Sequence, residues 1–207
     1  MENDLVFVSA QPDVPYFHWQ TKVYCHNFIE KGINPKNIHI LFGIVGGAEQ
    51  TKESLKLKSI GVNVHHYIDD RKTKTYIPSI KPFLIYKWLE EFNEHGKRFF
   101  LHDADIIFRE LPNFNKLLND DSTYLSDTVG YIGYNYIKDC CDRYEKSHPN
   151  SQKEQLLNEM AEVIGIDVQK IKNNQINSGG GQYLIKNTNC EIWKKIYEDC
   201  TPLYNQM

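Results

Sequence analysis

Short apolar segments alternate with amphipathic segments through the first half of the chain. The apolar segments have the length of buried strands and are followed by polar or glycine-rich turns. They predict four strands, at Leu5–Val8, Asn37–Phe42, Val62–His66 and Phe99–Leu101. Between them, apolar residues at helical spacing predict helices over about Phe17–Lys31, Gln50–Ser59 and Pro82–Glu94. This alternation is typical of an α/β fold, with a mostly parallel, Rossmann-like sheet flanked by helices.

The second half has a different pattern, with more helix and one further strand. Helices are expected over about Thr128–Tyr144, Gln152–Ile164 and Glu191–Tyr197. A glycine-rich segment, Asn177–Gln182, leads into an apolar strand at Tyr183–Ile185. Because no repeat or long linker divides the 207 residues, residues 1–207 are predicted to form a single compact domain.

Charge and composition narrow the class of protein. A net charge of -3 gives no basic surplus for binding nucleic acid or an anionic membrane. No apolar run approaches the ~18 residues of a membrane span, and Met1–Asp4 does not resemble the start of a signal peptide. The five cysteines include no C-x-x-C pair, which favours reduced thiols. A cytoplasmic protein without a membrane span is therefore predicted.

Asp103 and Asp105 are the strongest candidates for chemistry, because they directly follow a strand that should be buried. Carboxylates there are costly unless a cation or hydrogen-bond donors compensate them. Mn²⁺ or Mg²⁺ bridging to a diphosphate would do so. The alternative is a pair of loop aspartates that cap a helix or turn the chain. In a doubly wound sheet the carboxyl ends of the strands would place Ser9–Gln11 and Asp69–Arg71 on the same edge as this pair.

These motifs resemble those of a known family. The apolar strand, His102-Asp103-Ala104-Asp105 and the apolar run after it resemble the metal-binding signature of GT-A-fold nucleotide-sugar glycosyltransferases. Residues 177–185 are similar to the small-residue strand further along the chain in that family. The resemblance covers about residues 5–200. The short chain without an anchor looks like the small virus-encoded members, of the chlorella-virus type, that are thought to glycosylate capsids; such a protein would work in the host cytoplasm.

The resemblance implies a nucleotide-binding half at residues 1–108 and a sugar and acceptor half at residues 109–207. The donor would be a UDP-sugar, similar to UDP-glucose, and the acceptor a glycan or glycoprotein. Asp103 and Asp105 would hold the metal and contact the ribose, with Asp105 the firmer metal ligand. The other implied donor-binding residues in the first half are Val8, Ser9, Ala10 and Gln11 for base and ribose, Asp69, Asp70 and Arg71 for the nucleoside, Lys81 for phosphate or sugar, and Ala104.

In the second half, the resemblance places Asn177, Gly180 and Gln182 around the transferred sugar. Asp127 is the candidate base for an inverting reaction, and Gln182 the candidate stabiliser for a retaining one. The sequence leaves both stereochemical outcomes open. Many members of the family complete the metal site with a late histidine, whereas no histidine follows His148 here.

Two other functions are compatible with parts of the pattern. A nucleotidyltransferase would ordinarily carry a glycine-rich loop after the first strand, but Ser9–Asp13 contains no glycine. A non-catalytic nucleotide-sugar-binding domain of a larger multidomain glycosyltransferase remains the main alternative. UDP release from a UDP-sugar would distinguish an enzyme from such a domain.

Overall fold

A computed structural model describes residues 5–46, 48–92, 98–149, 151 and 153–206. The predicted end of the third helix at residues 93–96 lies outside this set, as do Gly47 and Gln152. Two compact units are distinguished along the chain. The first contains residues 1–124 and 182–197, and the second contains residues 125–181 and 198–207. The predicted functional division at residue 108 stays a prediction.

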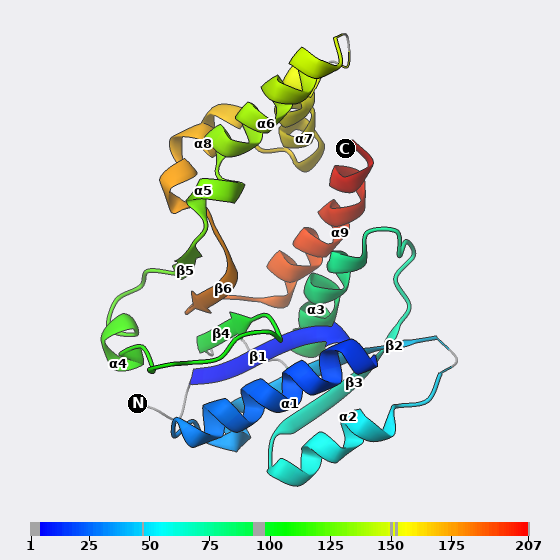
Figure 1. Ribbon diagram of the computed structural model, residues 1–207, viewed down its shortest axis with the longest axis vertical. Coiled ribbons are helices and arrows are strands. Elements are labelled where there is room, and N and C mark those ends of the chain that lie inside the picture. Colours follow the sequence, from blue (N-terminus) through cyan, green and yellow to red (C-terminus); the bar gives the residue numbers. More distant parts are fainter. Residues whose placement is uncertain (1–4, 47, 93–97, 150, 152, 207) are drawn as a thin grey trace. The chain divides into compact units, whose positions relative to one another are not determined.

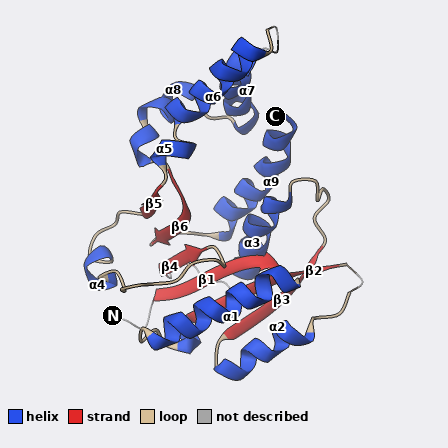
Figure 2. Cartoon of the chain, viewed as in Figure 1, coloured by secondary structure: helices blue, strands red, loops and turns tan. Residues whose placement is uncertain are grey.

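In the part of the chain that the structure describes, six strands form one mixed sheet, which confirms an α/β fold with a mostly parallel sheet (Figures 1 and 2). In chain order the strands are β1 Leu5–Pro12, β2 Ile38–Val45, β3 Asn63–Asp69, β4 Arg98–His102, β5 Tyr124–Asp127 and β6 Gly179–Ile185. Their spatial order is β3-β2-β1-β4-β6-β5. β1 pairs in parallel with β2 and β4, β2 pairs in parallel with β3, and β6 is antiparallel to β4. β5 was not predicted as a strand.

Helices cover both faces of the parallel strands. The α-helices of the first unit are α1 Pro15–Glu30, α2 Lys52–Lys56, α3 Ile80–Phe92 and α4 Phe114–Leu117, and 3₁₀ turns lie at Pro35–Asn37 (η2), Leu57–Ile60 (η3) and Ile77–Ser79 (η4). Pro15 occupies the first turn of α1, where its missing N–H costs nothing. Gly32, with φ at 93°, follows α1 in a left-handed conformation that glycine adopts without strain.

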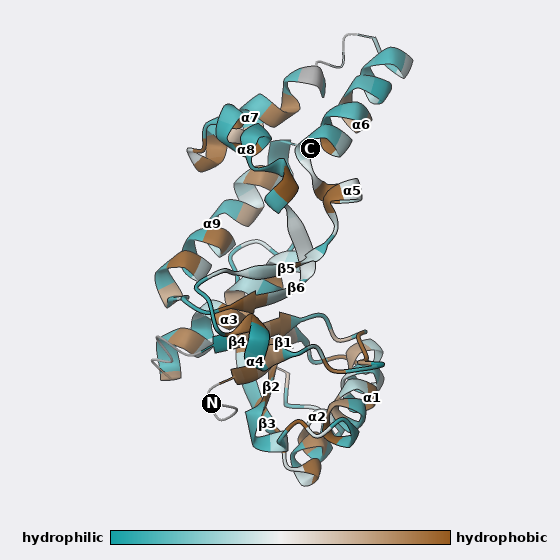
Figure 3. Cartoon of the chain, turned by 90° about the vertical axis from the view of Figure 1, so that its left-hand side faces the viewer, coloured by the Kyte–Doolittle hydropathy of each residue, from teal (hydrophilic) through white to brown (hydrophobic). Residues whose placement is uncertain are grey.

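Alternating side chains of β1 enter two separate cores. Leu5 and Phe7 point to the face covered by α1, where they pack with Tyr24 and Phe28. Val6 and Val8 point to the opposite face and pack against α3. In Figure 3 β1 is largely brown, whereas α3 has both brown and teal residues. Because both faces are covered, β1 and β2 are apolar over most of their length.

Two predicted turns are part of strands in the structure. β1 continues through Ser9, Ala10 and Gln11, which were predicted to form a loop. The polar side chains of Ser9 and Gln11 are accommodated because they hydrogen-bond under α1, while Ala10 enters the other core. Gly43 was predicted to begin a turn but lies inside β2. A Cβ on Gly43 would be 2.6 Å from the Ile80 Cδ1, so glycine here allows α3 to begin close to the sheet.

The second unit is mainly helical. Its helices are α5 Val129–Ile132, α6 Tyr134–Ser147, α7 Leu156–Ile164 and α8 Val168–Asn173, with 3₁₀ turns at Lys153–Gln155 (η5) and Gln175–Asn177 (η6). The single helix predicted over residues 128–144 is two helices, because the chain is extended at Gly133. The last helix, α9 Cys190–Gln206, extends nine residues beyond the predicted end at Tyr197 (206 − 197) and contributes to both units.

Candidate functional site

The carboxyl ends of the parallel strands meet at one edge of the sheet, as the alternating pattern predicted. Pro12 of β1 is level with Gly43 of β2, and Asp69 of β3 is level with Val45 of β2. β4 ends at His102, level with Ser9 of β1, and Asp103 follows immediately. Candidate residues from three strand ends therefore share this edge, while their roles in binding stay predictions.

Asp103 and Asp105 lie at the point where the chain leaves β4. Asp103 is part-buried, Ala104 is buried at 6% exposure and Asp105 is exposed. The Lys81 ammonium, from the first turn of α3, forms an ion pair with the Asp103 carboxylate. The structure thus brings together two residues that are 22 positions apart and that the sequence placed independently in the site. A carboxylate and a cation there can both interact with a charged ligand.

Buried His102 holds the start of this loop. Its Nδ1 lies 2.8 Å from the Asp103 carbonyl oxygen, and its ring packs against Tyr24 and Phe28. Burial lowers the pKa of His102 to about 4, although the bond to Asp103 and the Asp103 charge act in the opposite direction. The imidazole is therefore neutral at neutral pH, and its Nδ1–H donates to the carbonyl of Asp103.

Asp69 and Arg71 form a buried clamp at the end of β3. The Arg71 Nε and Nη2 donate to the two Asp69 carboxylate oxygens at 2.8 and 3.0 Å. Nη1 donates to Ser79 Oγ at 2.6 Å, so the clamp ties the loop after β3 to the turn before α3. Burial acts to raise the pKa of Asp69, but the hydrogen bonds and charge of Arg71 outweigh it and lower the pKa. Asp70, between them, is exposed and available to a ligand.

Strand pairing places Gln182 close to the start of the loop that contains Asp103 and Asp105. β6 runs antiparallel to β4, with Tyr183 level with Leu101. The next residue of β6 toward the amino terminus is Gln182, and the next residues of β4 lead into Asp103. The two motifs that carried the family resemblance are thus on neighbouring strands.

The remaining candidates belong to the second unit. Asp127 is the exposed last residue of β5, and it precedes Thr128, the N-cap of α5. Asn177 ends η6 and is exposed, whereas Gly180 is half-buried in β6. That these three residues contact the same ligand as Asp103 stays a prediction.

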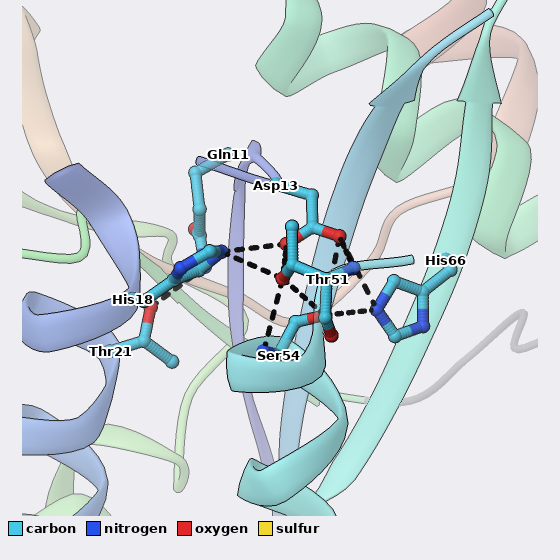
Figure 4. Close-up of polar contacts among 7 residues, drawn as sticks. All are labelled: Gln11, Asp13, His18, Thr21, Thr51, Ser54 and His66. Atoms are coloured by element: carbon cyan, nitrogen blue, oxygen red, sulfur yellow. Dashed lines mark hydrogen bonds and ion pairs between the residues drawn. The ribbon is translucent and has the colours of Figure 1, made fainter. Parts of the chain in front are cut away.

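Sequence reasoning missed a buried polar cluster around Asp13, just beyond β1 (Figure 4). Its carboxylate accepts hydrogen bonds from the backbone and hydroxyl of Thr51, at 3.0 and 2.7 Å, and from the Ser54 hydroxyl at 3.2 Å. His18 Nε2 lies 2.7 Å from Oδ1, the carboxylate oxygen that also accepts from the Thr51 hydroxyl. Burial acts to raise the pKa of Asp13, but the hydrogen bonds from Thr51 and His18 lower it overall. The cluster joins α1, α2 and the end of β1.

The cluster also includes His66 of β3, whose Nε2 lies 2.8 Å from Ser54 Oγ. Asp13, His66 and Ser54 are the three residue types of a serine hydrolase triad. In such a triad the aspartate and the serine contact opposite ring nitrogens of the histidine, whereas here Asp13 lies 3.9 Å from the same Nε2 that contacts Ser54. Ser54 is fully buried as well. The arrangement therefore supports a structural role. The sequence signal for Ser54 was Thr51-x-x-Ser54, since its other partners, His66 and Asp13, are 12 and 41 residues away.

Carboxylate oxygens, such as those of Asp103 and Asp105, are ligands that hard divalent ions prefer, and a metal held by this pair stays a prediction. Within the described residues, no cluster of three or more His, Cys, Asp or Glu side chains could enclose a metal. Mg²⁺ commonly uses one or two protein carboxylates and takes its other ligands from water and phosphate, so a pair is sufficient.

Among the helices that the structure describes, none is long and apolar enough to cross a membrane.

Comparison with known sequences adds no family assignment. No protein-family model matches the chain, and no curated protein matches it either.

Proposed function

We propose that this protein is a glycosyltransferase that transfers a sugar from a UDP-sugar to a glycan or glycoprotein acceptor with the help of Mn²⁺ or Mg²⁺. The observation that carries the proposal is the ion pair of Asp103 and Lys81 at the end of β4, with Gln182 on the neighbouring strand β6. The adjoining strands supply a rigid edge, and open α/β sheets bind ligands at their carboxyl edge.

Asp103 and Asp105 would hold the ion beside the donor diphosphate. A bound divalent ion supplies positive charge that stabilises the departing diphosphate without proton transfer. Lys81 adds a second positive charge at the same position once it exchanges its carboxylate partner for phosphate. The exposed Asp70 and the backbone at the end of β1 are available to the nucleoside.

Two residues are assigned to the sugar and acceptor. In an inverting reaction Asp127 would accept the proton of the acceptor hydroxyl as that oxygen bonds to the anomeric carbon and the diphosphate leaves. In a retaining reaction Gln182 would stabilise charge at the anomeric carbon with its amide oxygen. The choice of a UDP-sugar over other donors depends on the family resemblance.

A thermal-shift experiment tests the metal site. UDP and UDP-glucose, each with and without Mn²⁺, are added to the wild type and to Asp105→Ala. A ligand at 100 times its Kd stabilises the fold by about 2.7 kcal/mol, or about 5–10 °C for a chain of this size. We expect this shift in the wild type only with Mn²⁺, and no shift in Asp105→Ala.

Asp121→Ala is the matched control, because Asp121 is another exposed aspartate of the first unit. It should retain the full metal-dependent shift. Equal shifts in Asp105→Ala and the wild type would refute the metal assignment. A shift with GDP-mannose and none with any UDP-sugar would refute the donor, and UDP release from UDP-glucose would support an enzyme over a binding domain.

A further inference from the structure

A groove between α1 and the α2–η3 segment has no role in the proposed reaction. Its volume is about 640 Å³, within the usual range of about 300–1,000 Å³ for small-molecule sites. The residues that line it are Pro15, His18, Trp19, Lys22, His26, Glu53, Lys56, Leu57, Ser59 and Ile60. All of them belong to the first unit.

Trp19 is the most unusual residue of this groove. Its side chain is 58% exposed, whereas Trp88 and Trp193 are 1% and 8% exposed. Leaving a large aromatic ring in water forgoes about 1.5–3 kcal/mol of burial energy. Because Trp19 lines a groove, a ligand that enters the groove can cover this ring. Lys22 and His26 follow at helical spacing on the same side of α1.

The polar lining combines donors with an acceptor and has nearly balanced charge. Lys56 and Glu53 form an ion pair at 2.7 Å, which leaves Lys22 as the one lysine of the lining outside that pair. Ser59 and His26 add further hydrogen-bonding groups. A strongly acidic partner would need more positive charge than this, and an apolar helix would desolvate Lys22 and the Lys56–Glu53 pair without supplying hydrogen bonds in return.

The inner wall of the groove is rigid. His18 lines it and is held by Asp13 at 2.7 Å and by Thr51 at 3.2 Å (Figure 4). The ring also packs edge-on against Phe42 of the sheet. A wall fixed in this way loses little conformational entropy when a ligand binds.

We infer that this groove binds a neutral glycan chain, with a sugar ring stacked on the Trp19 indole. The C–H face of a pyranose is apolar and matches the indole, while its hydroxyl groups both donate and accept hydrogen bonds. Lys22 and His26 can donate to sugar oxygens. Glu53 can accept from sugar hydroxyls, and so can the Ser59 hydroxyl oxygen, whose proton is donated to the Lys56 carbonyl. The glycan site does not depend on the metal site; under the proposed function it would hold a part of the acceptor away from the point of transfer.

Acrylamide quenching of tryptophan fluorescence tests this inference, because the other two tryptophans are buried and the quenching reports mainly on Trp19. The probes are maltohexaose, cellohexaose, chitohexaose, xylohexaose and mannohexaose, each at about 10 mM, above the Kd of weak sites. We expect at least one of them to lower the quenching constant by about twofold, since a bound ligand buries most of the contact surface. Failure of all five to protect Trp19 would refute the glycan site, as would protection by UMP or polyglutamate alone.

The oligosaccharide that protects Trp19 is then titrated calorimetrically against variants. Trp19→Ala should weaken binding by about tenfold or more, because a tryptophan at the centre of a site supplies much of the binding energy. Tyr16→Ala is the matched control, since Tyr16 is 61% exposed on the same helix but does not line the groove. Unchanged affinity in a folded Trp19→Ala protein would refute the inference. Asp105→Ala should retain glycan binding, so the glycan site and the metal site fail or succeed separately.

Discussion

Asp69 was predicted to contact the nucleoside, yet its carboxylate is committed to Arg71, and this difference gives a sharp prediction. Asp69→Ala removes both acceptors of the Arg71 Nε and Nη2 hydrogen bonds. Arg71 is 6% exposed, so its guanidinium would stay buried, and among the described residues its remaining partners would be Ser79 and two backbone carbonyls. Removing one partner of a buried ion pair costs about 3–5 kcal/mol.

For a chain of this length, each kcal/mol shifts the melting temperature by about 2–4 °C, so Asp69→Ala should melt about 6–20 °C lower. Asp70→Ala is the control: Asp70 is exposed, and its loss should change stability by less than about 0.5 kcal/mol. Melting is followed by circular dichroism near neutral pH, and UDP affinity by calorimetry at a temperature where both variants are folded.

A melting temperature of Asp69→Ala equal to that of the wild type, together with lost UDP affinity, would refute the clamp and favour a ligand contact. The pH dependence gives a second test. Because the pKa of Asp69 is lower in the folded state, its contribution is present above the unfolded-state pKa of about 3.9 and is lost as the pH falls below it. Asp69→Ala should not show this loss of stability at low pH.

Two further predictions concern His102 and the sugar site. The pKa of His102 is about 4 when folded and about 6.5 when unfolded, so the free energy of unfolding should fall as the pH drops from 6.5 to 4, by up to about 1.4 kcal/mol per pH unit. Denaturant titrations should show a flatter profile for His102→Phe; an equal slope would contradict this assignment. Asp127→Asn and Gln182→Ala should keep UDP affinity within about threefold but lower sugar transfer by about 100-fold. Loss of stability with normal transfer per folded molecule would remove either residue from the site.

The strands of the parallel sheet were predictable because burial on both faces leaves an apolar segment that can be identified without knowing its partners. The full length of β1 was not predictable. Ser9 and Gln11 are polar, and their partners, Tyr24 and Thr21, come from a helix that had to be placed first. β5 has the pattern of a surface segment, with Leu125 and Asp127 exposed, so it lacks a signal for burial.

The candidate site likewise contains residues that a local sequence pattern identifies and residues that it does not. Asp103 and Lys81 were identified locally, from a carboxylate after a strand and a lysine before a helix, and the structure pairs them. The Asp13 cluster had no comparable local signal, because its members come from segments up to 53 residues apart (66 − 13). Whether a polar residue is satisfied within the protein or available to a ligand depends on such distant partners. The roles of Asp69 and Arg71 therefore could not be separated by sequence alone.

The discontinuous first unit has a consequence for the order of folding during synthesis. Residues 1–124 contain the four parallel strands, but the strand that pairs with the outer side of β4 is not made until residues 183–185 leave the ribosome. Until then, the backbone groups on that side of β4 remain an unpaired sheet edge, which can pair with other chains. A nascent chain stalled in the helical unit should therefore bind chaperones or aggregate more readily than one released after residue 197.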